Sequence, residues 1–280
     1  DDYQSDQNDY VRYIVEEGLK KRYKEITPEI RARADYEMNT IFSMGFSGYF
    51  LIGWEFINWA KSTYDPVHKC PKHYIPIGPG RGSGAGSLVA YAMTITDIDP
   101  FRFGLIFERF LNPERVSMPD FDVDMDFDYR QDIIQHTRYL YGKKKVGHIV
   151  TFGTLKPKNL IADVGRILGI PLSEVAMLKK CIPDSPKAKL KDAFSPPTEK
   201  FPDGGQLIPY KDDPRYTELF DLAFRLEGVK RNTGLHASGM VIGLTPLPDW
   251  APVFKDPKTG EVGVQYTMDI IEPCGLVKFD

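Results

Sequence analysis

The stretch Ser117–Asp128 reads S-M-P-D-F-D-V-D-M-D-F-D, and we call its alternating part, Asp120–Asp128, the acidic segment. Apolar side chains fill the positions between its aspartates. Because side chains alternate between the two faces of a β-strand, this period of two predicts a strand with one apolar face and one face of carboxylates. Like charges on one face repel, and aspartate is a poor strand former. The row therefore indicates a bound divalent cation with oxygen ligands, and Asp122 and Asp124 are its central pair.

A solvated acidic edge and a calcium loop are the alternative interpretations of the acidic segment. The acidic edge needs no ligand, and nothing in the segment alone excludes it. The D-x-D-x-D pattern also opens an EF-hand loop, which requires glycine at its sixth position and glutamate at its twelfth. Met125 and Gln131 stand there instead, so we reject the EF-hand. The sequence then predicts a strand that presents two carboxylates to one or two Mg²⁺ ions.

Length and composition are those of a globular protein. The 280 residues are 42% hydrophobic and 27% charged, enough for two domains or for one domain with a large insertion. No apolar run approaches the roughly 18–20 residues of a membrane helix, and the first residues lack the regions of a signal peptide. The widely spaced Cys70, Cys181 and Cys274 fit a reducing cytoplasm without disulfides. With a net charge of -3, any nucleic-acid contact must come from local basic clusters.

The beginning of the chain is predicted to be helical. Helical spacing of apolar residues extends to about Lys24. Thr27 and Pro28 supply a cap and a first-turn proline for a second helix, which should run to about Ser43. The aromatic stretch 50–59 fits a strand or a buried helix, and we favour a helix that continues into Ala60 and Lys61.

The loop expected at residues 63–74 carries His68, Cys70 and His73. A structural zinc site needs four ligands, and the sequence offers no fourth ligand nearby. We therefore do not predict zinc here, and the sequence assigns this loop no role.

A glycine-rich stretch follows, Gly78–Ser87, which reads G-P-G-R-G-S-G-A-G-S and which we call the glycine turn. It lies between an expected short strand, Ile75–Ile77, and an expected helix, Leu88–Met93. Glycines let backbone N–H groups approach an anion, and a helix N-terminus favours negative charge, so the turn predicts a phosphate site. The side-chain donors that the turn adds are Arg81, Ser83 and Ser87.

The sequence of the glycine turn leaves its ligand open. The turn lacks the Gly-Lys-Ser/Thr of a Walker A loop. It does fit a loose dinucleotide fingerprint, Gly80-x-Gly82-x-x-Ala85, so a dinucleotide-dependent oxidoreductase is an alternative. A glycine-rich turn without any ligand is the simplest interpretation.

Beyond the acidic segment the sequence predicts a helix, a strand and then a basic helical insertion. The helix covers Tyr129–Tyr141 and ends at Gly142, and the strand covers His148–Phe152. From about Thr154 lysines are frequent, and short helices alternate with proline-rich loops. The helices expected in this insertion are 159–168, 172–180 and 213–226. Its lysines either hold a phosphate backbone or simply face water.

The last part of the chain is predicted to return to strands. Met240–Ile242 is an apolar strand, and a turn at Asp256–Gly260 joins two further strands. On the final strand Lys278 and Asp280 share one face. They could form an ion pair, but the earlier aspartate pair favours Asp280 as a third metal ligand. Because the chain stops inside this strand, we expect it to be part of a longer protein.

Several long motifs, in order along the chain, resemble those of one family. They are G-F-S-G-Y-F-L-I, G-P-G-R-G-S-G-A-G-S, F-E-R-F-L-N-P-E-R-V-S-M-P-D-F-D-V-D, N-T-G-L-H-A-S-G and G-L-V-K-F-D. Nearly the whole chain resembles the alpha subunits of bacterial DNA polymerase III, the C-family replicative polymerases. The resemblance implies an α+β fold, a polymerase-beta-like nucleotidyltransferase palm with an inserted α-helical thumb. Residues 1–153 and 236–280 would form the palm, and residues 154–235 the thumb.

The resemblance also implies a site for metal-dependent nucleotidyl transfer. Asp122, Asp124 and Asp280 correspond to the catalytic acids of the family and would bind two Mg²⁺ ions, for which Mn²⁺ can substitute. The implied nucleotide-binding residues are Arg81, Gly82, Ser83, Gly84, Ser87, Lys278, Arg109 and Arg115. The implied reaction is template-directed transfer of deoxynucleotides from dNTP to a primer 3′-OH by a two-metal mechanism.

The implied partners are primer–template DNA and dNTP, with the sliding clamp and other holoenzyme subunits bound mostly through regions outside this chain. We expect a cytoplasmic protein without membrane contact. The family's PHP domain, fingers and clamp-binding region are not in these residues, so this part alone should be inactive. One alternative is a smaller nucleotidyltransferase of the same fold with a non-DNA acceptor. The other is an NAD-binding dehydrogenase, which would leave the acidic segment without a purpose.

Overall fold

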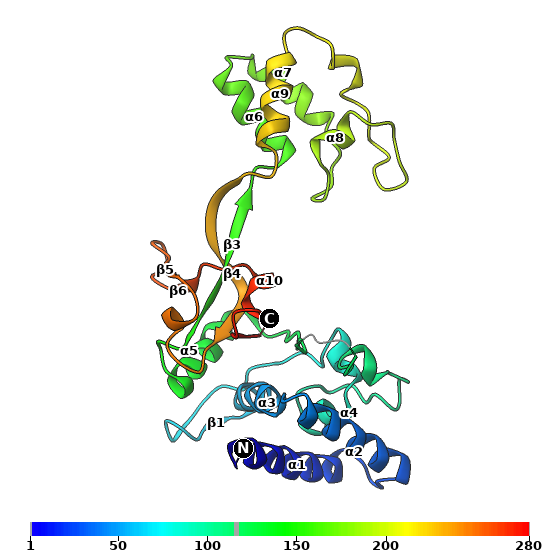
Figure 1. The fold of residues 1–280 in the computed structure, drawn as a ribbon, viewed down its shortest axis with the longest axis vertical. Coiled ribbons are helices and arrows are strands. Elements are labelled where there is room, and N and C mark those ends of the chain that lie inside the picture. Colours follow the sequence, from blue (N-terminus) through cyan, green and yellow to red (C-terminus); the bar gives the residue numbers. More distant parts are fainter. Residues whose placement is uncertain (1, 115–117, 280) are drawn as a thin grey trace. The chain divides into compact units, whose positions relative to one another are not determined.

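A computed structural model of the chain describes residues 2–114 and 118–279 and divides the chain into two compact units. Unit 1 consists of Asp1–Val150 and Leu235–Asp280, and unit 2 consists of Thr151–Gly234. Each unit has its own hydrophobic core. Strands β3 (Val146–Thr154) and β4 (Lys230–Ile242) carry the chain from unit 1 into unit 2 and back (Figure 1).

Unit 1 begins with three helices, α1 (Asp2–Arg22), α2 (Pro28–Ser43) and α3 (Ser47–Lys61), so the helices predicted here are confirmed. Helix α2 starts where local chemistry dictates. The Thr27 hydroxyl accepts a hydrogen bond from the backbone N–H of Ile30, and a proline fills the first helical position. Every helix among the described residues is too short or too polar to cross a lipid bilayer.

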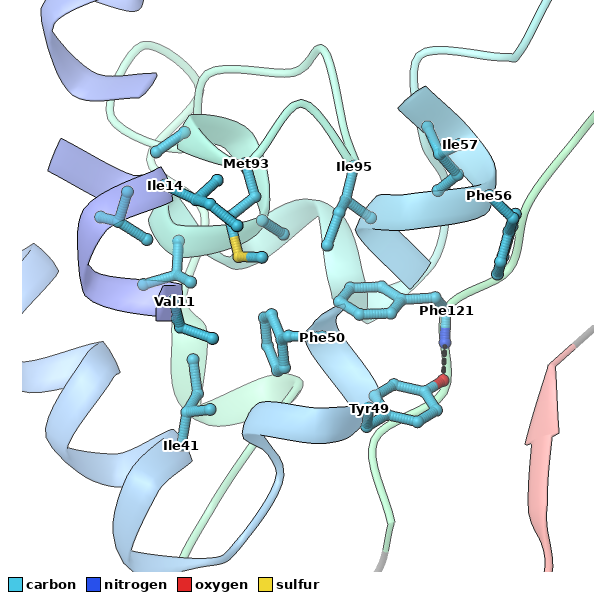
Figure 2. Packing of buried hydrophobic residues seen from close by; sticks show 14 of the residues in the cluster. Val11, Ile14, Ile41, Tyr49, Phe50, Phe56, Ile57, Met93, Ile95 and Phe121 are labelled. Atoms are coloured by element: carbon cyan, nitrogen blue, oxygen red, sulfur yellow. Dashed lines mark hydrogen bonds between the residues drawn. The ribbon is translucent and has the colours of Figure 1, made fainter. Parts of the chain in front are cut away.

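The core of unit 1 lies where these helices and α4 (Leu88–Ala92) meet the acidic segment (Figure 2). Phe50 of α3 is fully buried and packs edge-to-face on Phe121, with ring centroids 5.1 Å apart. The Tyr49 hydroxyl accepts a hydrogen bond from the backbone N–H of Phe121 at 2.9 Å. The helices therefore hold the acidic segment by its apolar side.

The strands form a mixed sheet in the order β5-β6-β3-β4-β7. Besides β3 and β4, the strands of this sheet are β5 (Val253–Lys255), β6 (Val262–Val264) and β7 (Val277–Phe279). Two further helices of unit 1 are α5 (Arg130–Tyr141) and α10 (Met268–Ile271). Strand β6 runs parallel to β3, whereas β7 is antiparallel to β4, with Phe279 opposite Met240. Gly142, at φ 99°, ends α5 as predicted. Helices together with a mixed sheet confirm the α+β class.

The strand predicted over the acidic segment is wrong. In residues 118–129 the extended backbone makes one isolated bridge, between Met125 and Ile77, before it turns into a 3₁₀ helix, η3 (Phe127–Tyr129). The neighbouring segment 75–79 contains two prolines, which lack the N–H groups that a strand ladder needs. For the same reason, the short strand expected just before the glycine turn is wrong.

The alternation of side chains in the acidic segment is retained in part without a sheet. Phe121 is buried, Val123 and Met125 are half-buried, and Phe127 is 76% exposed. One side of the segment therefore packs on the core as far as Met125, whereas the Asp124 side chain is 61% exposed.

Between α3 and the glycine turn, the expected loop contains a short hairpin of β1 (Tyr64–Asp65) and β2 (Cys70–Pro71). Asp65 holds its turn, because Oδ1 accepts from the backbone N–H groups of Val67 and His68, and Oδ2 lies 2.8 Å from His68 Nδ1. Burial acts to raise the pKa of Asp65, but these contacts outweigh it and lower the pKa to about 2.

Unit 2 contains the predicted helical insertion. Its helices are α6 (Pro157–Ile167), α7 (Leu172–Lys180), α8 (Leu190–Ala193) and α9 (Thr217–Leu226) (Figure 1). Leu160, Leu178 and Leu219 are buried in the core that they enclose. The three predicted helices are therefore confirmed, with α9 starting at Thr217 rather than at Asp213.

An ion pair joins α5 to the residue that precedes β6. The guanidinium of Arg138 is almost fully buried and pairs with Glu261, which also accepts a hydrogen bond from Gln131 at 3.2 Å. We expect Glu261→Gln to lower the free energy of unfolding by about 2 kcal/mol, because it leaves a buried guanidinium without its counter-ion. Urea unfolding checks this. Glu17→Gln, which removes an exposed ion pair with Lys20, should leave the free energy of unfolding nearly unchanged.

The stabilisation by this ion pair should depend on pH. Arg138 lowers the pKa of the Glu261 carboxyl, so the pair contributes stability above the ordinary pKa of glutamate and loses it as the pH falls through the lowered pKa. The difference between wild type and Glu261→Gln should be largest near neutral pH and shrink in acid. A difference that stays constant into acid would show that the carboxylate charge is not its cause.

Candidate functional site

The two central aspartates of the acidic segment lie together and are bridged by an arginine. Arg81 Nε donates to Asp124 Oδ1 at 3.1 Å, and Arg81 Nη2 lies 3.4 Å from Asp122 Oδ1. Both carboxylates reach solvent, because the Asp122 side chain is 28% exposed and that of Asp124 is 61% exposed. The guanidinium thus occupies a position between two carboxylates that suits a cation.

The glycine turn lies directly against these aspartates. The backbone N–H of Gly78 donates to the carbonyl of Asp124 at 2.8 Å. Gly82 has φ 69° and ψ −158°, a conformation that is essentially restricted to glycine. A Cβ atom on Gly82 would lie 2.7 Å from Asp122 Oδ2. The structure therefore brings the turn and the aspartate pair, which are about 40 residues apart in the sequence, into contact.

The later glycines of the turn allow close packing inside the protein. A Cβ atom on Gly84 would lie 2.9 Å from the ring of Phe121, and one on Gly86 would lie 2.7 Å from the carbonyl oxygen of Ile106. Both glycines are buried. Gly84, which the resemblance assigned to nucleotide binding, therefore shapes the turn from its buried side.

A pocket of about 340 Å³ opens beside the glycine turn, and we call it the glycine-turn pocket. It is lined by Gly82, Ser83, Gly86, Gly104, Leu105, Ile106 and Arg109. Ser83 starts a 3₁₀ helix, η1 (Ser83–Gly86), and Arg109 ends another, η2 (Phe107–Arg109). Three of the predicted nucleotide contacts, Gly82, Ser83 and Arg109, thus share one pocket, whereas Arg115 lies outside the described residues.

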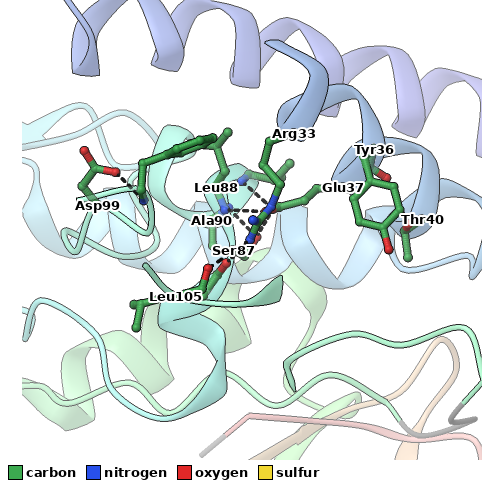
Figure 3. Close-up of polar contacts among 12 residues, drawn as sticks. Arg33, Tyr36, Glu37, Thr40, Ser87, Leu88, Ala90, Asp99 and Leu105 are labelled. Atoms are coloured by element: carbon green, nitrogen blue, oxygen red, sulfur yellow. Dashed lines mark hydrogen bonds and ion pairs between the residues drawn. The ribbon is translucent and has the colours of Figure 1, made fainter. Parts of the chain in front are cut away.

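The N-terminus of α4 is already occupied, contrary to the expectation that it binds phosphate. The buried carboxylate of Glu37, on α2, accepts hydrogen bonds from the backbone N–H groups of Leu88 and Val89, both at 3.0 Å (Figure 3). The Ser87 hydroxyl donates to Glu37 at 2.9 Å and accepts from the N–H of Ala90 at 3.0 Å. Ser87 is fully buried and its hydroxyl is engaged by these two bonds, so its predicted contact with the nucleotide stays a prediction that this structure does not support.

The last strand lies beside the acidic segment. Lys278 Nζ lies 3.1 Å from Glu272 and 3.6 Å from Asp120. Burial acts to lower the pKa of the Lys278 ammonium, but the two carboxylates outweigh it and raise the pKa overall. Lys278, predicted as a triphosphate contact, is thus held as a cation by two acids.

Asp280, the predicted third metal ligand, lies outside the described residues. The residue before it is placed, because the ring of Phe279 stacks on Tyr49 with centroids 4.7 Å apart. The ring of Phe121, the residue before Asp122, also stacks on Tyr49, at 5.4 Å. One aromatic cluster therefore fixes both backbone segments that lead to predicted metal ligands.

The donor chemistry of the aspartate pair suits a hard divalent cation such as Mg²⁺, which prefers oxygen ligands. Within residues 2–114 and 118–279, no three histidine, cysteine, aspartate or glutamate side chains gather in a way that could hold a metal ion. The pair thus offers two carboxylates of a metal site, and a further protein ligand has to come from elsewhere. In the same described ranges, His68, Cys70 and His73 do not form a zinc site.

Three residues of the site were missed by reasoning from the sequence. Glu37 follows Arg33 by four positions, a spacing that predicts an ion pair on a helix and says nothing of the α4 N-terminus that Glu37 caps. Tyr49 belongs to an aromatic run that the sequence assigns to the core. Glu272 has no neighbouring signal that would connect it with Lys278.

The geometry contradicts the dinucleotide alternative. That fingerprint needs a strand of a parallel sheet before the glycines and a helix after them whose N-terminus faces the pyrophosphate. Here the segment before the turn makes one bridge, and α4 has only five residues. The N-terminus of α4 is also filled by a carboxylate.

An α+β unit in which paired aspartates face a glycine-rich turn is consistent with the nucleotidyltransferase-like class of protein. Residues 9–280 match the family described as the bacterial DNA polymerase III alpha NTPase domain, and the chain belongs to this family. The family that the motifs predicted is thereby confirmed.

Relatives with high identity carry the same name. The DNA polymerase III subunit alpha of Treponema pallidum (strain Nichols) is 54% identical over 276 residues, which are 99% of this chain and 22% of the relative. That of Borreliella burgdorferi is 50% identical over 272 residues, 97% of this chain and 22% of the relative. That of Escherichia coli (strain K12) is 47% identical over 265 residues, which are 95% of this chain and 21% of the relative. The chain spans about a fifth of the length of these relatives.

Proposed function

We propose that this chain forms the palm and the thumb of a replicative DNA polymerase subunit, with unit 1 as the palm and unit 2 as the thumb. In the longer protein it would transfer deoxynucleotides from dNTP to a primer 3′-OH under the direction of a template. The observation that carries this proposal is the pair of Asp122 and Asp124, bridged by Arg81 against a glycine turn, in a chain of this family.

The proposed metal ligands are Asp122, Asp124 and Asp280. When bound, two Mg²⁺ ions, or Mn²⁺ in their place, would lower the pKa of the primer hydroxyl and stabilise charge on the leaving pyrophosphate. Arg81 offsets one of the two negative charges of the pair in the described structure, and its side chain is 56% exposed. Because its guanidinium can turn away from the carboxylates toward solvent, we propose that Arg81 binds the triphosphate of the nucleotide.

The proposed site of the triphosphate is the glycine-turn pocket. Ser83 offers a hydroxyl and Arg109 a guanidinium, and Gly82 lets the backbone approach a phosphate closely. Lys278 would act on the triphosphate indirectly. It stays paired with Glu272 and Asp120 and offsets the negative charge of the acidic segment. Arg115 is proposed as a further triphosphate contact on the basis of the motif alone.

The proposed partners are primer–template DNA and dNTP. The sliding clamp and other holoenzyme subunits would bind mostly through parts of the protein outside this chain, in the cytoplasm. The names of the relatives, each a subunit of DNA polymerase III, support DNA and other subunits as partners, whereas the particular partners are proposed from the motifs.

Unit 2 offers a basic groove that suits the DNA backbone. A pocket of about 430 Å³ is lined by residues of α6 and α7. The cationic residues among them are Lys158, Arg166, Lys179 and Lys180. Since phosphate contacts release counter-ions from DNA, this groove would bind without regard to sequence and with a strong dependence on salt.

We expect the double change Lys179→Glu and Lys180→Glu to weaken binding of the full-length polymerase to primer–template DNA about tenfold and to flatten its salt dependence. Fluorescence anisotropy over a series of salt concentrations measures both effects. Lys20→Glu with Lys21→Glu, in the last turn of α1, changes the net charge equally and should leave the salt slope unchanged. Equal losses in both double variants would mean that net charge alone governs binding.

Primer extension by the full-length polymerase tests the proposed function. We expect addition of the complementary deoxynucleotide only, with an absolute need for Mg²⁺ and a template. Addition that ignores the template would favour a nucleotidyltransferase with another acceptor. No addition by purified wild-type polymerase would contradict the proposal.

A further inference from the structure

A buried ion pair on α2 is bonded to the backbone of the glycine turn. Arg33 Nε donates to Glu37 Oε1 at 2.6 Å (Figure 3). The Glu37 carboxylate is fully buried, and the hydroxyl and amide bonds that it accepts from Ser87, Leu88 and Val89 hold the end of the turn. One side chain, from a helix about 50 positions earlier in the sequence, thus accepts hydrogen bonds from three consecutive residues.

The arginine of this pair connects the two walls of the glycine-turn pocket. Arg33 Nη2 donates to the carbonyl of Gly86 at 3.0 Å and to the carbonyl of Leu105 at 3.4 Å. Gly86 lies in the wall formed by the turn, and Leu105 lies in the wall formed by the segment that leads to Arg109. The guanidinium also lies over the ring of Phe107 at 6.0 Å, which fixes its plane. The planar guanidinium therefore bonds both walls, which also meet directly where Gly86 lies against the carbonyl oxygen of Ile106.

Every partner of the Glu37 carboxylate in this cluster is a donor. Two backbone N–H groups, a hydroxyl and a guanidinium N–H are directed at its two oxygens, so the ionised carboxylate satisfies all of them. Burial raises the pKa of Glu37, and these donors oppose the rise. A glutamine in its place would turn an amide N–H₂ toward donors and leave part of the cluster unsatisfied.

We propose that Arg33 and Glu37 are positioning residues that fix the width of the glycine-turn pocket and thereby the affinity for the incoming dNTP. They touch neither nucleotide nor metal, and act through Gly86, Ser87 and Leu105. This inference rests on the proposed function, because it takes the pocket as the triphosphate site. It also gives the buried Ser87 hydroxyl a role in place of the predicted contact with the nucleotide.

Steady-state primer extension by the full-length polymerase tests this inference with Glu37→Gln and Arg33→Lys. Each variant should raise the KM for dNTP about tenfold, while kcat and the KM for primer–template stay within about twofold of wild type. Arg33→Lys keeps the charge beside Glu37 but loses the fork that spans the two walls, and it is the deciding variant if Glu37→Gln does not fold. A merely structural role would lower the number of active molecules, and thus kcat, without changing the KM for dNTP.

Thr40→Val is the matched control on the same helix. The buried Thr40 hydroxyl donates to the carbonyl of Tyr36 at 3.0 Å, within α2 itself, so its loss should leave the KM for dNTP unchanged. An unchanged KM for dNTP in Arg33→Lys, or an equal rise in Thr40→Val, would overturn the inference while wild-type extension still supports the proposed function. Wild-type polymerase that extends no primer would overturn the proposed function first, and the inference with it.

Discussion

Replacing Asp122 or Asp124 by asparagine in the full-length polymerase should reduce the single-turnover rate of primer extension by about 1,000-fold. Asparagine keeps the shape of the side chain, and its carbonyl can still accept the bond from Arg81. It loses the negative charge that a divalent cation requires of its ligand. Because both side chains reach solvent, the variants should unfold at nearly the same urea concentration as wild type.

Asp126→Asn is the matched control for these two variants. It removes the same charge from the same segment, and the asparagine carbonyl can still accept the bond that Asp126 Oδ1 receives from the N–H of Asp128 at 3.0 Å. Its rate should stay within about twofold of wild type, as for an ordinary surface change. An equal loss in all three variants would mean that the acidic segment acts through its total charge. Full activity of both Asp122→Asn and Asp124→Asn would place the metal site elsewhere.

The same variants can be examined for metal binding without turnover. Calorimetric titration with Mn²⁺ in the presence of dNTP should show that wild type binds the ion. The affinity for Mn²⁺ should be at least about tenfold lower in Asp122→Asn. Asp126→Asn should bind as wild type does. Equal affinity for Mn²⁺ in wild type and both variants would show that the aspartate pair does not bind the metal, even if the rates of primer extension differ.

Elements with strong local signals could be predicted from the sequence. Thr27 before a proline places the start of α2, and Gly142 places the end of α5, because cap and left-handed conformations depend on one or two residues. The acidic segment shows the limit of such signals. Its alternation correctly indicates which side chains face the core near Phe121, but a strand also needs a partner. The partner segment carries prolines and lies about 45 positions away.

The candidate site divides in the same way. The motifs name the residues of the turn and of the acidic segment, but the position of Arg81 between Asp122 and Asp124 was not predicted. What each residue does there depends on contacts between distant parts of the chain. Ser87 looks like a phosphate donor until Glu37 is seen to hold it. A buried carboxylate that caps a helix in another part of the fold leaves no periodic pattern in a sequence.

Gly82→Ala should reduce primer extension by about 100-fold, because the methyl group would push Asp122 out of its position beside Arg81. A Cβ atom on Gly82 would lie 2.7 Å from Asp122 Oδ2, closer than a carbon and an oxygen can pack. The backbone at φ 69° and ψ −158° adds strain, so the free energy of unfolding should fall by about 1–3 kcal/mol.

Gly169→Ala separates the effect of strain from that of contact with Asp122. Gly169 follows α6 in unit 2, has φ 71°, and would present its Cβ atom to open space. The Gly169→Ala variant should lose about 1 kcal/mol of the free energy of unfolding, because its left-handed backbone is strained. Its rate of primer extension should be unchanged. A Gly82→Ala variant that lost stability and kept its rate, as Gly169→Ala should, would show that the aspartate pair tolerates movement. The close approach of the glycine turn would then serve the fold alone and not the placement of the metal ligands.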